Sequence, residues 1–364
     1  MKRYIILFLV LISLNNLFSQ TPNNDPNWEL VWRDDFNTLN TNIWKVMDNF
    51  DHYCSNPTVS LSRNVAVSNG SLEMTLKKED YRCPNQFVNP WFCVCQYNNN
   101  SHIYRYTTGS VETQNDYSTQ FGYMEARIAF PYNYNFTGAF WTFVKEGIAY
   151  SNGEGCIEAD TNASEIDIVE FKGNLKDHGI EDSTITRYYL TSCIHRCYDT
   201  TYFWDNYAQC FSPPNYEWDD NIWHTYALEW SPNRLIFYVD DYPHRIITDH
   251  KIFMPVRILL GLNLMGDTPA NANIPLPRKM KVDYVSVYRL KKDCDTELNL
   301  CNYNFSNYDN TVKKKITIGN GSCSNSISVG DNVFLRASEE VLINGDFTVP
   351  VGAELFIDVD QCER

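Results

Sequence analysis

The chain has 364 residues, of which 43% are hydrophobic and 21% are charged. These values are typical of a globular protein and exclude a disordered or collagen-like chain. Acidic residues outnumber basic residues by 45 to 30, giving a net charge of −15, and no block of basic residues interrupts this excess. Nucleic acid is therefore not an expected partner.

The first segment has the features of a secretory signal peptide. Lys2 and Arg3 form a basic start, an apolar stretch follows over 4–14, and Ser19 offers a small residue at a cleavage site. The apolar stretch is shorter than the about 20 residues that a membrane-spanning helix needs. We therefore expect a signal peptide at 1–19, an exported mature protein, and no membrane contact after cleavage.

The cysteines predict disulfide bonds. All 12 lie beyond the signal peptide, and an even number in an exported chain indicates oxidised pairs. Cys193, His195 and Cys197 could contribute to a zinc site, but no partner ligands stand at zinc-finger spacing. Disulfides are therefore favoured, and the sequence leaves their pairing open.

Short alternating runs separated by Gly, Pro, Asn and Asp dominate the chain, whereas helical periodicity is scarce. The clearest runs are 71–77, 122–130, 225–230, 235–239 and 282–288. Many short strands with frequent turns predict an all-β sandwich or jelly roll.

The composition changes after about residue 291. All 9 Trp lie between Trp28 and Trp230, and none follows in the tail. We therefore expect a large β domain over 20–291 and a small β module over 292–364. Four cysteines are available to staple this module, namely Cys294, Cys301, Cys323 and Cys362.

The segment 164–171, Ser-Glu-Ile-Asp-Ile-Val-Glu-Phe, carries three carboxylates among apolar residues. In a regular strand Glu165 and Asp167 would share one face, but Glu170 would point into the apolar face. One extra residue at Ile168 and Val169, a β-bulge, places all three carboxylates on one face. The polarity of the segment therefore predicts a bulge at this point.

Three carboxylates on one strand face suit retaining glycoside hydrolysis, which needs a nucleophile and a general acid roughly 5–5.5 Å apart. We predict Glu165 as the nucleophile and Glu170 as the general acid, which neighbouring negative charge keeps protonated. Asp167 would orient Glu165. The Cα atoms of the two glutamates would be roughly 13–16 Å apart, so their side chains must lean toward each other. A solvated acidic strand face without chemistry is the alternative interpretation.

At these residues the chain resembles glycoside hydrolase family 16, whose signature has the form E-x-D-x-x-E. Further segments match the family in order along the chain, at 30–37, 106–109, 121–128, 139–141, 223–230, 237–240 and 280–288. The resemblance implies a concanavalin-like β-jelly roll whose acidic signature lies on a concave strand face.

The resemblance also implies substrate-binding residues. Glu125 and Arg127 alternate with apolar residues in one strand and would line sugar subsites, the alternative being a surface ion pair. Trp141 would stack on a sugar ring, the alternative being core packing.

A structural calcium ion is a further implication of the resemblance. Asp283 would be a ligand, together with backbone groups near Asp35 and Gly70. We expect no cofactor for catalysis.

The expected function is an endo-acting, retaining β-glycosidase that hydrolyses a polysaccharide, with a β-1,3-glucan such as laminarin as the first choice. The alternatives are a galactan hydrolase of the agarase, carrageenase or porphyranase type, a transglycosylase of the same family, and a catalytically silent, lectin-like binding protein. The segment 136–138 lacks the Trp-Pro that laminarinases usually carry there, and 145–163 resembles an insertion, so both affect substrate choice. We expect a monomer.

Overall fold

The computed structural model describes residues 21–22, 28–50, 58–82, 103–131, 136–145, 163–172, 189–196, 222–231, 234–247, 252, 254–264, 276–305, 308, 311–319, 321–329 and 332–359. In this part of the chain regular structure is almost entirely β-strand, with two short 3-10 helices at Ser62–Asn64 and Asn115–Tyr117. The chain divides into two compact units, Leu30–Arg289 on the one hand and Met1–Glu29 with Leu290–Arg364 on the other, and each is described by itself.

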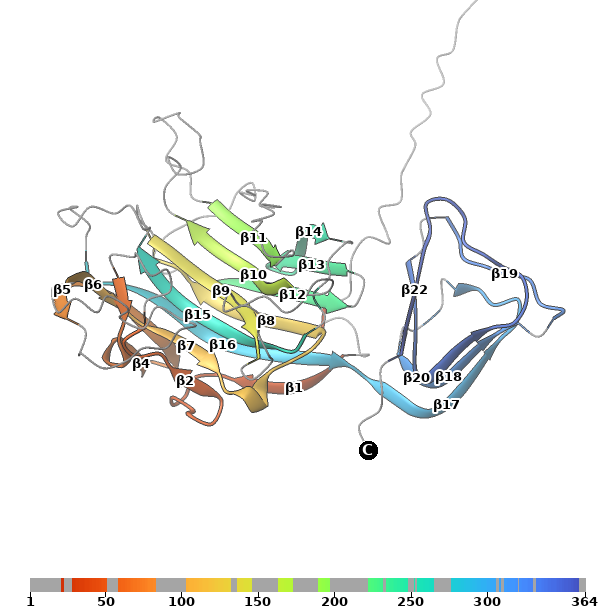
Figure 1. Cartoon of the computed structure of the whole chain (residues 1–364), viewed down its shortest axis with the longest axis horizontal. Coiled ribbons are helices and arrows are strands. Elements are labelled where there is room, and N and C mark those ends of the chain that lie inside the picture. The colour runs from red at the N-terminus through yellow and green to blue at the C-terminus, as the bar shows by residue number, and fades with distance from the viewer. Residues whose placement is uncertain are drawn as a thin grey trace, which may run out of the picture. The chain divides into compact units, whose positions relative to one another are not determined.

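The larger unit contains two sheets that form two layers (Figure 1). The ten-stranded sheet has the order β14 (Tyr242–Ile247), β13 (Arg234–Val239), β12 (His224–Ser231), β8 (Gly122–Ala129), β16 (Arg278–Leu290), β5 (Ser71–Arg82), β6 (Ile103–Thr108) and β3 (Thr58–Ser60), with β1 (Trp28–Asp34) beside β16 and β4 (Val65–Ser68) beside β5. The six-stranded sheet has the order β11 (Tyr189–Arg196), β10 (Ala163–Lys172), β9 (Phe136–Val144), β15 (Val256–Leu264), β7 (Ser110–Thr113) and β2 (Trp44–Val46).

One apolar core fills the space between these sheets. Because side chains alternate along a strand, each sheet sends every second residue toward its partner. Met124, Ala126 and Ile128 enter the core from β8, and Phe140 and Leu260 enter it from β9 and β15. This arrangement confirms the predicted all-β jelly-roll sandwich, since the alternating runs of the sequence become its strands.

The smaller unit is a parallel β-solenoid, which we call the coil. Four strands pair in parallel in the order β17 (Lys292–Leu300), β18 (Val312–Ile318), β20 (Asn332–Ile343) and β22 (Glu354–Val359). The short strands β19 (Asn325–Ser326) and β21 (Phe347–Thr348) pair in parallel as well. Ile316, Ile318 and Leu335 belong to a separate small core. Successive strands that pair in parallel stack as turns of a coil, so each turn buries the apolar face of the next.

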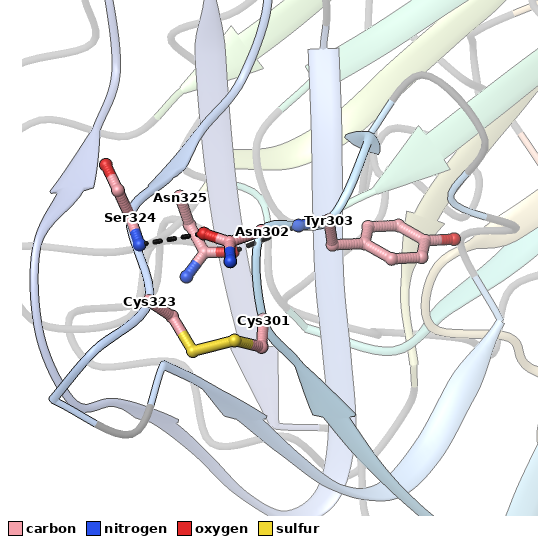
Figure 2. The surroundings of a disulfide bond; sticks show 6 residues. All are labelled: Cys301, Asn302, Tyr303, Cys323, Ser324 and Asn325. Carbon is pink, nitrogen blue, oxygen red and sulfur yellow. Dashed lines mark hydrogen bonds between the residues drawn. A yellow bond between two sulfur atoms is a disulfide. The ribbon is translucent and has the colours of Figure 1, made fainter.

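A disulfide bond joins Cys301 to Cys323 inside this unit (Figure 2). The same two segments are also held by amide side chains: Asn302 Oδ1 accepts a hydrogen bond from the Ser324 backbone at 3.0 Å. Asn325 Oδ1 accepts one from the Tyr303 backbone at 3.3 Å. Cys294 is also disulfide-bonded. The side chains of the other cysteines lie outside the described residues.

Candidate active site

Strand β10 contains the predicted bulge. Against β9, Asp167 is paired with Trp141 while Val169 is paired with the next residue back, Phe140, so Ile168 is the extra residue. The ladder with β11 shifts over the same stretch, between Asp167 and Glu170. The bulge that was predicted from polarity is confirmed. The reason is that no regular register could send the apolar residues of this strand into the core without also sending Glu170 into it.

The bulge separates the polar and apolar side chains of β10. Ile166, Ile168, Val169 and Phe171 all belong to the core between the sheets. Because side chains alternate along a strand and the bulge adds one residue, Glu165, Asp167 and Glu170 lie on the opposite side of β10 from these apolar residues, and we call these three residues the acidic face. Asp167 is only 3% exposed and Glu170 only 8%, so two of the three carboxylates are largely removed from water.

Aromatic side chains of β9 share the acidic face. Residues directly opposite each other in an antiparallel pair point to the same side. Phe143 is opposite Glu165, and Trp141 is opposite Asp167. Both aromatic residues are half-buried, and their rings meet edge to face at 6.0 Å. Trp141 therefore lies on the acidic face and presents a partly exposed ring beside Asp167.

A buried charged group extends this face across β15, β7 and β2. Leu259 is opposite Trp141 on one side and Glu112 on the other, so Glu112 lies in the same cross-strand row as Asp167. Arg257 Nη1 donates to Glu112 Oε2 at 2.5 Å, with both side chains buried. The half-exposed Lys45 approaches Glu112 Oε1 at 2.8 Å.

We did not predict Lys45, Glu112 or Arg257 from the sequence. The sequence marks such residues only by a charge within an otherwise apolar strand. Arg257, which stands before Ile258 and Leu259, is an example. A charged residue at such a position is buried only if it has a partner, and here the partners come from distant segments.

Comparison with known proteins identifies the family. A model of glycosyl hydrolases family 16 matches residues 55–286, a span that includes β10 and most strands of both sheets. The chain belongs to glycosyl hydrolase family 16.

This family 16 member has curated relatives at low identity. It is 24% identical over 282 residues to the clotting factor G alpha subunit of Tachypleus tridentatus, covering 73% of this chain and 35% of that protein. It therefore spans about a third of the length of that relative. It is also 24% identical over 317 residues to a β-glucanase of Rhodothermus marinus, covering 79% of this chain and 95% of that protein.

A solved structure shows the same fold. The endo-β-1,3-glucanase from Pyrococcus furiosus matches with a TM-score of 0.54 at 22% identity. The match covers 72% of this chain and 95% of that chain. The jelly roll predicted from the alternating strands is thus a fold already observed in a glucanase.

Glu125 and Arg127 of this family 16 member lie in the other sheet from the acidic face. Met124, Ala126 and Ile128 point from β8 into the core, so the alternating residues Glu125 and Arg127 point away from it on the far side of the sandwich. This placement corrects the expectation that these two residues line sugar subsites beside the acidic signature. Alternation identified a polar face of β8, but it did not reveal on which side of the sandwich that face lies.

The side chains of Glu125 and Arg127 have partners in the ten-stranded sheet. Glu125 accepts hydrogen bonds from the Tyr284 hydroxyl at 2.6 Å and the Tyr123 hydroxyl at 3.3 Å. Burial raises the pKa of the Glu125 carboxyl, and the two tyrosine hydroxyls oppose that shift. Arg127 Nη1 donates to Asp283 Oδ2 at 2.7 Å, and its guanidinium lies over the Trp223 ring.

The calcium ion stays a prediction, and the two aspartates named for it each form an ion pair. Asp283 is the extra residue of a second bulge, in β16. Its side chain forms an ion pair with Arg127. Asp35 is paired with the Arg33 guanidinium at 2.7 Å, and Gly70 occupies the turn between β4 and β5 with φ +71°. Among the described residues, no group of three or more His, Cys, Asp or Glu side chains is placed to hold a metal ion. We derive no chemistry from calcium.

Several sequence predictions lie outside the described residues. They include the signal peptide at 1–19 and nearly all of the insertion at 145–163. None of the described residues forms a helix with the length and apolar character needed to cross a bilayer.

Proposed function

We propose that this family 16 protein is an exported, endo-acting, retaining β-glycosidase and that it hydrolyses a β-1,3-glucan. The observation that carries the proposal is the bulge at Ile168, because it alone brings Glu170 to the same face as Glu165 and Asp167. Membership of the family and the β-glucanase relative support both the reaction and the substrate class.

The chemistry takes two displacements at the anomeric carbon. In the first, the Glu165 carboxylate attacks this carbon while Glu170 donates its proton to the departing glycosidic oxygen, which leaves a glycosyl ester on Glu165. In the second, water attacks the same carbon, Glu170 takes a proton from the water, and the ester bond breaks to regenerate the Glu165 carboxylate. Two inversions give net retention of configuration.

The surroundings of the acidic face suit these roles. Glu170 is nearly buried on the same face as Asp167, and in this proposal it supplies the proton that the departing glycosidic oxygen takes up. Glu165 is more exposed, as a nucleophile that must reach a sugar ring has to be. Trp141 presents an apolar ring surface beside Asp167, which would hold the apolar face of a glucose residue.

The test is hydrolysis by the purified mature protein of laminarin, lichenan, agarose, porphyran and carrageenan, followed by the release of reducing ends. We expect cleavage of laminarin, with the β-anomer as the first product in a proton NMR time course. Cleavage of a galactan alone would overturn the substrate class, and binding without cleavage of any glycan would favour the lectin-like alternative.

Substitution of the two glutamates tests the assigned roles. We expect Glu165→Gln and Glu170→Gln to lower kcat by about 1,000-fold or more, because each removes a group that takes part in bond breaking. Glu73→Gln is the matched control, since Glu73 is a buried carboxylate of the ten-stranded sheet paired with Lys279. Near-normal rates in either of the first two variants would exclude the role given to that residue.

A further inference from the structure

The core side of β10 carries an aromatic stack directly behind Glu170. Phe171 follows Glu170 and points into the core, where its ring stacks on that of Phe130 with centroids 5.4 Å apart and planes 7° from parallel. Phe130 follows the end of β8, in the other sheet. The stack therefore crosses the sandwich and ties the end of β10 to the opposite layer.

Gly138 makes room for this stack. On β9, Gly138 is paired in register with Phe171. A Cβ atom at Gly138 would lie 2.4 Å from Phe130 Cδ1 and 2.6 Å from Cε1, well inside contact distance. The Phe130 ring thus lies directly against the β9 backbone beside Phe171. Behind it, the ring of Tyr226 approaches to 5.5 Å, so Phe130 is enclosed by rings and backbone.

The bulge is what makes this packing consequential. The ladders of β10 with both neighbours shift between Asp167 and Glu170 and are in register again at Glu170 and Phe171. Regular alternation does not set the point at which the ladders resume, so the direction of Glu170 depends on how Phe171 is packed. The residue directly after it is held by the Phe130 ring.

We propose that Phe130 is a positioning residue for Glu170, acting through Phe171 from the opposite sheet. This inference rests on the proposed function, in which Glu170 is the proton donor. Phe130 itself contacts no substrate, because it lies within the core. Its effect is to hold the bulged end of β10 in the one arrangement that points Glu170 at the glycosidic oxygen.

The test compares Phe130→Leu with Phe237→Leu. Phe237 is a fully buried core aromatic of β13, so its substitution removes a ring of the same size from the same core. We expect kcat on laminarin to fall about 10- to 100-fold in Phe130→Leu with KM changed less than about threefold, because a small displacement of a reacting group lowers the rate steeply. Phe237→Leu should keep the wild-type kcat per folded molecule.

A second arm uses Gly138. In Gly138→Ala the added methyl group would displace the Phe130 ring, so kcat should fall to a similar extent. The double variant Phe130→Leu with Gly138→Ala should be no worse than the more impaired single variant, since both changes act on one contact. Multiplying losses in the double variant would show that the two residues act independently and would overturn the proposal.

Amide hydrogen exchange over 163–172 gives a readout that needs no activity. We expect exchange there to be at least about tenfold faster in Phe130→Leu than in Phe237→Leu. Equal exchange and equal kcat in these two variants would overturn the positioning role. If the wild-type chain hydrolyses no glycan, the proposed function fails, and the exchange comparison still decides whether Phe130 holds β10.

Discussion

At the scale of single residues, burial decides what a carboxylate can do. Three carboxylates are less than a tenth exposed, namely Asp167, Glu170 and Glu125. Asp167 and Glu170 lie on the six-stranded sheet, whereas Glu125 lies on the ten-stranded sheet at the opposite side of the sandwich. Two tyrosine hydroxyls donate hydrogen bonds to the Glu125 carboxyl. Among the interactions described, no cationic side chain contacts it directly. A carboxyl group in this position favours its neutral form.

Glu125 therefore predicts a pH dependence of stability. Its pKa is raised by burial above the ordinary value of 4.5, so the folded state binds the proton more tightly than the unfolded state. The favourable contribution is complete below pH 4.5 and is lost as the pH rises through the folded pKa. The glutamine side chain of Glu125→Gln cannot ionise. The melting temperature of this variant minus that of the wild type should therefore increase between about pH 4 and pH 7.

Thermal unfolding of both proteins, followed by circular dichroism at several pH values, measures this difference. Glu73→Gln serves again as a control, because Glu73 is paired with Lys279 and its substitution should not reproduce the gain. A melting-temperature difference that stays constant or shrinks as the pH rises would contradict the prediction.

At the scale of the element, one inserted residue decides the chemistry of β10. Side chains alternate with period two, so adding or removing a single residue moves every following side chain to the other face. The bulge uses this property to keep Phe171 in the core while Glu170 faces outward. The strand is locally irregular because a regular strand of this sequence would turn Glu170 into the core and Phe171 out of it.

Deletion of both Ile168 and Val169 tests this reading of the strand. Glu170 would then follow Asp167 directly, so regular alternation would turn it toward the apolar core, where an unpaired charge costs several kcal/mol. We expect hydrolysis to fall below detection and urea unfolding to show a markedly less stable protein. Val169→Ala keeps the extra residue and loses only buried methyl groups, so it should keep hydrolysis within about tenfold of the wild type. A deletion variant as active as Val169→Ala would show that the bulge is dispensable.

At the scale of the whole molecule, the candidate site belongs to one unit. The acidic face, its aromatic neighbours and the Phe130 stack all lie within Leu30–Arg289. The parallel coil of Leu290–Arg364 has its own core and the disulfide between Cys301 and Cys323, which are 22 residues apart in the chain. We propose that the larger unit is catalytic and that the coil is an accessory module.

Loss of the Cys301–Cys323 disulfide should therefore separate stability from activity. Replacement of both cysteines by Ser should destabilise the coil by about 3 kcal/mol, the loop entropy expected for this separation. The hydrolysis rate at 25 °C should be unchanged. Differential scanning calorimetry and a laminarin assay on the same samples measure the two effects, and a parallel loss of activity would show that the site depends on the coil.

The sequence alone determined features that depend on local alternation. The strands, the all-β fold and the bulge at Ile168 all follow from one rule, that apolar side chains are buried and unpaired charges are not. The same rule identified the polar faces of β8 and β10, because each face repeats along its own strand. The family resemblance, and not this rule, named Trp141; its strand pairs with β10 and brings it opposite Asp167, and its stacking on a sugar ring stays a prediction.

Only the tertiary structure decided which faces share a side of the sandwich. It separated Glu125 and Arg127 from the acidic face, and it brought Lys45, Glu112 and Arg257 together from three distant segments. The physical reason is that alternation has the same period in every strand, so it carries no information about the partner sheet. That information lies in contacts between residues far apart in the chain, such as the stack of Phe130 on Phe171.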